Sequence, residues 1–230
     1  MHLSLTRISF SDMFAASHIE QVEALLSRRG AVVLFSGPDG CGKTTTLLVA
    51  GCEAMYTEDN EKVMILGSIS DADSAYLAAE TARRGGLALS VISADDAIEA
   101  WRLAVEYGIE SSDIAGIIAQ RLLKEICSNC ITSYTAPPDI LARIGMVGQN
   151  VALYRGEGCP ECENTGFRGR LAIHELLILN DKLHTLMCNS ASLETIRNAA
   201  QQSGMRTFRQ GGIQRALEGH TTIEEVFNKT

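Results

Sequence analysis

The sequence predicts an α/β fold, in which a parallel sheet is covered by helices on both faces. Short apolar runs at residues 31–36, 63–66 and 87–92 alternate with longer segments of helical periodicity, and the links between them are short. Alternation of this kind is typical of a parallel sheet. Two further features refine the prediction: a glycine-rich segment directly after the first apolar run, and two paired-cysteine motifs in the second half of the chain.

The helices are predicted from apolar spacing and from their end signals. Residues 18–28 place Ile19, Val22, Leu25 and Leu26 at helical spacing. Several later helices end at glycines or begin at a capping residue, and the last one is expected to begin near Thr222. The other predicted helices span residues 43–55, 72–84, 95–107, 114–126, 192–203 and 207–218.

The glycine-rich segment, residues 37–44, has the pattern G-x-x-x-x-G-K-T. Glycines let successive backbone N–H groups turn toward a phosphate, and the helix that follows adds positive potential. Lys43 can reach the outer phosphates, and the Thr44 hydroxyl can ligate Mg²⁺. Asp39 brings a negative charge to this segment and either points to solvent or weakens affinity. The predicted nucleotide-binding residues are Gly37, Pro38, Asp39, Gly40, Cys41, Gly42, Lys43, Thr44 and Thr45.

Four cysteines form two C-x-x-C motifs about thirty residues apart, at Cys127 and Cys130 and at Cys159 and Cys162. Two such motifs supply the closed tetrahedral shell of a structural Zn²⁺ site. The intervening residues 131–158 are polar and rich in turn formers, and we expect an irregular excursion that metal binding stabilises. A redox dithiol or an iron–sulfur cluster is the alternative. The other three cysteines, Cys41, Cys52 and Cys188, are interpreted as small buried side chains.

Composition narrows the class of protein. The net charge of −8 and the pI near 5.2 argue against a nucleic-acid partner held by bulk electrostatics. No apolar stretch has the length needed to cross a bilayer, and the N-terminus lacks the pattern of a secretory signal. We therefore expect a cytoplasmic protein without direct membrane insertion, peripheral to the inner membrane only through partners.

Further motifs accompany the loop and the cysteines. They are A-Q-R-L at 119–122, G-C-P-E-C at 158–162, T-G-F-R-G-R at 165–170, I-H-E-L-L at 173–177, G-M-R-T-F at 204–208 and E-G-H-T-T-I-E-E-V at 218–226. In this order they resemble the secretion ATPases that assemble type II secretion pseudopili and type IV pili. The cysteine pairs resemble the assembly and secretion branch, because retraction motors usually lack them. The resemblance implies a RecA-like core that binds Mg-ATP between the subunits of a homo-hexamer. It also implies partners in the machine: cytoplasmic components and an inner-membrane platform protein.

The chain departs from that family where hydrolysis is expected. Ser68 stands at the position of the family's Walker B glutamate, and Ser93 stands at that of the histidine in its histidine box, whereas Asp71 matches. The segment before Met64 is shorter than in the family, with Glu58 and Asp59 as a remnant of its acidic box. Serine carries no charge and is a poor base, so we expect nucleotide binding with weak or lost hydrolysis.

These observations predict a RecA-like P-loop NTPase core, a zinc-binding hairpin and a small C-terminal helical region. The expected segments are residues 1–30 (helical lead-in), 31–126 (NTPase core), 127–171 (zinc hairpin) and 172–230 (C-terminal helices). The function expected is that of an ATP-binding subunit of a secretion or pilus assembly system. A fully active motor and a non-catalytic, zinc-stabilised scaffold are the alternatives. An unrelated small-molecule kinase fits the loop but neither the cysteines nor the C-terminal motifs. His174 is interpreted as a packed histidine bonded to backbone rather than as a ligand.

Overall fold

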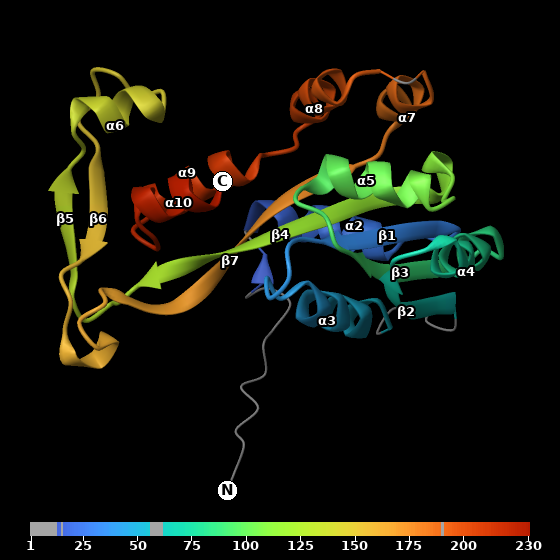
Figure 1. Cartoon of the computed structure of the whole chain (residues 1–230), viewed down its shortest axis with the longest axis horizontal. Helices are drawn as coiled ribbons and strands as arrows, with labels where there is room; N and C mark the ends of the chain where they lie inside the picture. The colour runs from blue at the N-terminus through green and yellow to red at the C-terminus, as the bar shows by residue number, and fades with distance from the viewer. Residues whose placement is uncertain (1–12, 15, 56–61, 190) are drawn as a thin grey trace, which may run out of the picture. The chain divides into compact units, whose positions relative to one another are not determined.

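The computed structural model describes residues 13–14, 16–55, 62–189 and 191–230 (Figure 1). Glu58 and Asp59 lie outside these residues. The described residues form two compact units. The first contains the chain up to Gln120 together with His174–Arg206, and the second contains Arg121–Ile173 and Thr207–Thr230. These units do not coincide with the four segments expected from the sequence.

The central element of the first unit is a five-stranded sheet with the strand order β2-β3-β1-β4-β7. Strand β1 pairs in parallel with both β3 and β4, and β2 pairs in parallel with β3, so the predicted α/β class is confirmed. Strands β4 and β7 are long and continue into the second unit. The strands span β1 Ala31–Ser36, β2 Val63–Ile69, β3 Leu87–Ile92, β4 Ile114–Ile126 and β7 Phe167–Ile178.

The register of this sheet decides which residues meet at its edge. Ser36 at the end of β1 lies opposite Ile92 of β3 and Ala119 of β4. Because parallel strands end at the same edge of a sheet, the residues that follow these three positions lie side by side. Gly37, Ser93 and Gln120 are therefore neighbours at the carboxyl edge.

Helices cover both faces of the sheet. Residues of α2 and α3 pack against alternate residues of β1 and β3, including Val33, Phe35 and Leu89, in one buried apolar cluster. Right-handed crossovers place α4 and α5 on the other face, and Figure 1 shows α3 and α5 on opposite sides of the sheet. The helices of this unit are α2 Ala16–Leu26, α3 Lys43–Met55, α4 Ala72–Arg83, α5 Ala97–Glu106, α7 Asp181–Cys188 and α8 Leu193–Gln202.

The helix predicted over residues 114–126 was wrong, because this segment is strand β4. Its first seven residues are all buried, as expected for a strand between two others in a covered sheet. Gly116 permits close approach of Leu25, since a Cβ there would lie 2.8 Å from the leucine methyls. The periodicity of a continuous apolar run does not distinguish a buried strand from a buried helix. Here the segment is a strand because it lies between two neighbouring strands of the sheet.

The second unit contains an antiparallel pair, β5 (Ile131–Thr135) and β6 (Ala152–Gly156), linked through helix α6 (Pro138–Arg143). The irregular excursion expected here is therefore an ordered hairpin. Helices α9 (Phe208–Leu217) and α10 (Ile223–Lys229) complete the unit. The Tyr154 ring of β6 lies against Gly219, where a Cβ would come within 3.3 Å of it.

Two other segments differ from the sequence prediction. Residues 172–178, expected in the C-terminal helical region, belong to strand β7. Helix α7 was missed, although Asn180 caps it by accepting a hydrogen bond from the Leu183 N–H at 2.9 Å. Within the part of the chain that is described, none of the helices has both the length and the hydropathy needed to cross a bilayer.

Candidate functional site

The glycine-rich loop leaves the buried strand β1 and ends at the first residue of α3. Gly37, Gly40 and Gly42 have φ of +145°, +76° and +87°, a backbone region that favours glycine. A Cβ on Gly37 would lie 2.3 Å from the Gln120 carbonyl oxygen. All three positions favour glycine for conformation, and Gly37 requires it for space as well. The loop therefore has the strand–turn–helix setting of a phosphate-binding segment.

Lys43 lies across this loop. Its Nζ is 3.1 Å from Asp39 Oδ1 and 3.4 Å from the Pro38 carbonyl oxygen. The lysine side chain is 11% exposed, whereas the aspartate side chain is 97% exposed. The ammonium group therefore lies at the loop, with Asp39 and the Pro38 carbonyl as its partners. The residues that follow, Thr44 and Thr45, are exposed at the start of α3.

A cavity of about 360 Å³ opens beside the loop. It lies at the carboxyl ends of β1 and β3 and includes Ser93, one of the candidate catalytic positions expected from the resemblance. This is the location at which open α/β sheets bind their ligands. The cavity is lined by Pro38, Asp39, Ser93, Ala94, Asp95, Glu99 and Leu103.

The other two candidate catalytic positions lie on and after β2. Ser68 is exposed on β2, which is an outer strand of the sheet, and pairs with Val91 of β3. Asp71 caps helix α4, because its carboxylate accepts hydrogen bonds from the Ser74 N–H at 2.8 Å and from the Ser74 hydroxyl at 2.6 Å. Chiefly the Ser74 hydroxyl, and then its N–H, lower the pKa of Asp71. Neither residue lines the cavity that contains Ser93.

Gln120 lies beneath the loop and was not among the site residues predicted from the sequence. Gln120 is 3% exposed, and its amide donates a 2.7 Å hydrogen bond to the Cys41 carbonyl oxygen. His174, also buried, places its Nε2 3.0 Å from Gln120 Oε1. His174 is buried, as predicted, but it bonds to the Gln120 side chain rather than to the backbone acceptor that was expected. The sequence signal that could have indicated Gln120 was a polar glutamine directly after an apolar run.

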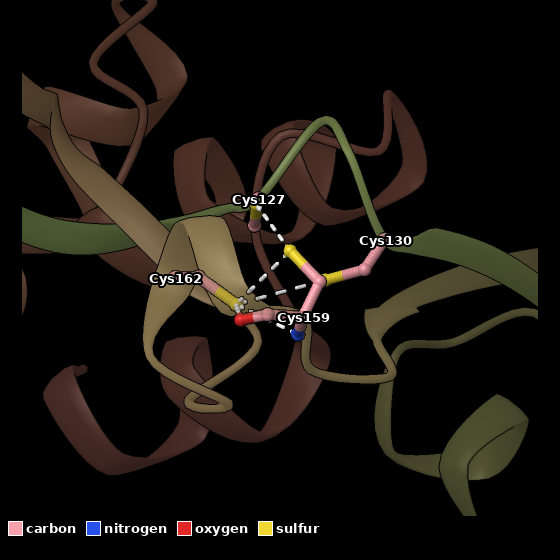
Figure 2. A group of neighbouring side chains, drawn as sticks. All are labelled: Cys127, Cys130, Cys159 and Cys162. Atoms are coloured by element: carbon pink, nitrogen blue, oxygen red, sulfur yellow. Dashed lines mark hydrogen bonds between the residues drawn. The ribbon is translucent and has the colours of Figure 1, made fainter.

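The four cysteines lie together in the second unit (Figure 2). Cys127 follows the end of β4, and Cys130 precedes β5. Cys159 precedes a short 3₁₀ turn and Cys162 ends it, after which Glu163 and Asn164 have positive φ. Backbone hydrogen bonds join the two motifs: the Cys127 N–H donates to Gly166 O at 3.0 Å, and the Glu157 N–H donates to Cys130 O at 3.0 Å.

The sulfur positions fit a tetrahedral metal shell. The four Sγ atoms lie within 4.8 Å of one another, with separations of 3.8 Å (Cys127–Cys159), 3.8 Å (Cys130–Cys162) and 3.7 Å (Cys159–Cys162). Zn–S bonds of about 2.3 Å in a regular tetrahedron place sulfurs about 3.8 Å apart. All four cysteines are free rather than disulfide-bonded. The donor set therefore suits Zn²⁺.

One sulfur of the cluster is favoured as a thiolate. Burial raises the pKa of Cys162, but the N–H groups of Cys159 and Gly166, each 3.3 Å from the sulfur, together with the Cys159 and Cys130 thiols outweigh it and lower the pKa to about 6. Burial is the largest influence on Cys130 and Cys159 and raises the pKa of both thiols. The backbone around Cys162 thus prepares one anionic ligand for a cation.

Comparison with known proteins identifies the family. The family model described as "Type II/IV secretion system protein" matches residues 53–228, which is more than half of the chain. The chain belongs to this family. It is 31% identical to the type II secretion system protein E of Pseudomonas aeruginosa, over 86% of this chain and 48% of that protein. It is 28% identical to the type IV pilus assembly ATPase PilB of Thermus thermophilus, over 94% of this chain and 30% of that protein.

Solved structures support the same fold. The pilus retraction motor PilT with bound ADP aligns with a TM-score of 0.67 and 17% identity, over 96% of this chain and 66% of that one. The Legionella pneumophila ATPase DotB aligns with a TM-score of 0.63 and 12% identity, over 91% and 62%. The RecA-like core predicted from the resemblance is thereby confirmed at the level of fold.

This secretion-family chain spans no more than half the length of the two curated relatives described above. The alignment to PilB covers 263 positions, but 94% of this chain of 230 residues supplies only about 216 of them. About 47 positions of the relative therefore have no counterpart here.

Proposed function

We propose that this chain is an ATP-binding subunit of a type II secretion or type IV pilus assembly machine. The observation that carries the proposal is the loop from Gly37 to Thr44, whose three positive-φ glycines and inward lysine form a cradle for phosphate. The relatives are described as secretion or pilus ATPases, and the PilT structure is described with bound ADP, which supports the same ligand class. Mg²⁺ is proposed to accompany the nucleotide through the exposed Thr44 hydroxyl.

Titration calorimetry with Mg-ATP tests this proposal. The wild-type chain is expected to bind one equivalent, and Lys43→Met is expected to lose at least about tenfold in affinity, because the loop loses its cation. Lys62→Met removes an exposed lysine elsewhere in the first unit and serves as the matched control. Absence of binding by the wild-type chain up to millimolar Mg-ATP would reject the proposal.

We propose in addition that Zn²⁺ binds to Cys127, Cys130, Cys159 and Cys162 and stabilises the second unit. Four thiolates close the metal shell and leave no position for a substrate, so the role is structural. When bound, zinc would supply the tertiary stability that a two-stranded hairpin lacks in water. The sulfur separations of 3.7 and 3.8 Å support this assignment over a redox dithiol.

Hydrolysis is proposed to be weak or lost. Ser93 lies in the cavity beside the loop and Ser68 lies on an outer strand, and neither hydroxyl supplies a charge or an effective base. The steady-state rate of phosphate release from Mg-ATP is expected to be near background in the wild-type chain. It is expected to rise in the double variant that carries both Ser68→Glu and Ser93→His. Vigorous release by the wild type, abolished by Lys43→Met, would instead support the active-motor alternative.

The proposal also covers the proteins with which this chain assembles. Secretion or pilus machinery is expected from the family, with other copies of this chain and an inner-membrane platform protein as candidates. Sedimentation velocity with and without Mg-ATP tests self-association: a hexamer supports the family assembly, and a monomer under both conditions favours a scaffold or regulatory subunit.

A further inference from the structure

A buried polar network lies directly beneath the phosphate loop. Its centre is the Gln120 side chain of β4, which bonds to the Cys41 carbonyl at 2.7 Å, to the Thr46 hydroxyl at 2.6 Å and to His174 Nε2 at 3.0 Å. All four residues belong to the first unit, and all are buried. Two of them belong to the loop and the start of α3, and the other two belong to strands.

The orientation of the Gln120 amide follows from its partners. The Cys41 carbonyl can only accept, so the amide nitrogen must face it. The Gln120 oxygen therefore faces Thr46 and His174, which must both donate. This assignment places a proton on Nε2 of His174. Each polar atom of the glutamine thus has a specific partner, as a buried amide requires.

The bond to Cys41 controls the direction of a loop N–H. In a trans peptide the N–H of Gly42 points opposite to the C=O of Cys41. Because Gln120 holds that carbonyl, the Gly42 N–H is directed away from Gln120. Rotation of this peptide would turn a carbonyl oxygen toward an anion, which repels it.

Packing around the network leaves the loop little freedom on this side. A Cβ on Gly42 would lie 3.1 Å from Gln120 Nε2, and one on Gly37 would lie 2.6 Å from Cys41 Sγ. The His174 ring in turn lies against the Phe14 ring, with centroids 4.7 Å apart. Gln120 is therefore itself held on the side opposite to the loop.

We propose that Gln120, supported by Thr46 and His174, is a positioning residue that keeps the phosphate loop in its anion-binding conformation before nucleotide arrives. The proposal rests on the nucleotide site proposed above, and it adds the residues that preorganise that site. Preorganised donors bind more tightly because the ligand need not order them. None of the three side chains is required to touch the nucleotide.

Two measurements test the proposal. The first is the rate at which a maleimide modifies Cys41 in the nucleotide-free chain, followed by mass spectrometry of the peptide that contains it. Cys41 is 5% exposed, so its thiol reports opening of the loop. The second is the affinity for Mg-ATP. In Gln120→Met, which keeps the length of the side chain, we expect about tenfold faster modification and about tenfold weaker binding, the scale of one lost buried hydrogen bond.

Thr46 supplies a matched set of variants. Thr46→Val is expected to behave like Gln120→Met, Thr46→Ser is expected to restore the wild-type values, and the double variant is expected to lose little more than either single one. The control is Thr81→Val. Thr81 is also a buried threonine within a helix, but it lies on α4 and its hydroxyl donates to the Leu77 carbonyl at 2.9 Å rather than to Gln120.

The outcomes are separable. Wild-type Cys41 protection and affinity in Gln120→Met would overturn the proposal, as would an equal effect of Thr81→Val, which would indicate general destabilisation. If the wild-type chain binds no Mg-ATP, the proposed function fails, and the modification rates still decide whether Gln120 orders the loop.

Discussion

The ion pair between Lys43 and Asp39 makes a specific prediction about affinity. Asp39 lies in the phosphate loop, and its carboxylate is 3.1 Å from the lysine ammonium. A phosphate must take the place of this carboxylate at Lys43 and must also tolerate its charge nearby. The variant Asp39→Asn removes the charge and retains the size of the side chain. We expect it to bind Mg-ATP more tightly than the wild-type chain.

The structure sets the size of the effect. Asp39 is 97% exposed, so its ion pair is solvated and contributes about 0–1 kcal/mol. Two unit charges about 6 Å apart in water interact by about 0.7 kcal/mol, and Mg-ATP carries about two net negative charges. The repulsion from two charges is about 1.4 kcal/mol, and with the ion pair the sum is about 1.4–2.4 kcal/mol, which predicts a dissociation constant about 10- to 60-fold lower in the variant at low salt. Salt at 0.5 M is expected to reduce the difference, because the charges are exposed.

Titration calorimetry with Mg-ATP at low and high salt measures both the gain in affinity and its dependence on salt. Glu53→Gln is the matched control, because it removes an equal exposed charge from the last turns of α3, the helix that follows the loop. An unchanged or weaker affinity of Asp39→Asn, or an equal gain in Glu53→Gln, would refute the reasoning. The first result would mean that Asp39 does not compete with phosphate. The second would mean that only net charge matters.

Three further predictions concern the loop and the cysteine cluster. Gly37→Ala is expected to abolish Mg-ATP binding, because its Cβ would lie 2.3 Å from Gln120 O, whereas Gly40→Ala has open space and is expected to lose about tenfold or less in the same titration. Elemental analysis is expected to find one zinc per wild-type chain, with a large loss in Cys162→Ser but none in Cys188→Ser, whose exposed cysteine lies outside the cluster. In metal-free, reduced protein, the pKa of Cys162 is about 6 when folded and about 9 when unfolded, so the free energy of unfolding in urea should rise from pH 6 to pH 9. The rise should be absent in Cys162→Ser. Folding raises the pKa of Cys130 and Cys159, so these two thiols act in the opposite direction and lower the free energy of unfolding as the pH approaches and passes 9.

Local signals were sufficient for much of this molecule. Strands β1 and β3 and helix α3 were predicted at their observed bounds, because short apolar runs and a glycine-rich turn separate them clearly. The cysteine pairs were predicted to share one centre, and their sulfurs do lie within 4.8 Å. The fold class and the family followed from the same motifs.

The failures have a common physical cause. Residues 114–126 were predicted as a helix, and the hairpin of β5 and β6 was expected to be irregular. In both segments the conformation depends on strands that are distant in sequence, and no periodicity within the segment reports their presence. Asp71, named from the sequence as a possible catalytic residue, also caps helix α4 by accepting a hydrogen bond from the Ser74 N–H.

The amino-acid sequence alone determined the chemistry that this chain can offer: glycines and a lysine suited to phosphate, four thiols suited to a metal, and uncharged serines at positions 68 and 93. These properties depend on residue type and short spacing, which a linear pattern contains. Only the tertiary structure decided that Gln120 of β4 lies beneath the loop, that His174 holds it, and that Ser93 shares a cavity with Asp39 while Ser68 does not line it. Those relations arise from sheet register and strand order, which are set by contacts between segments far apart in the chain.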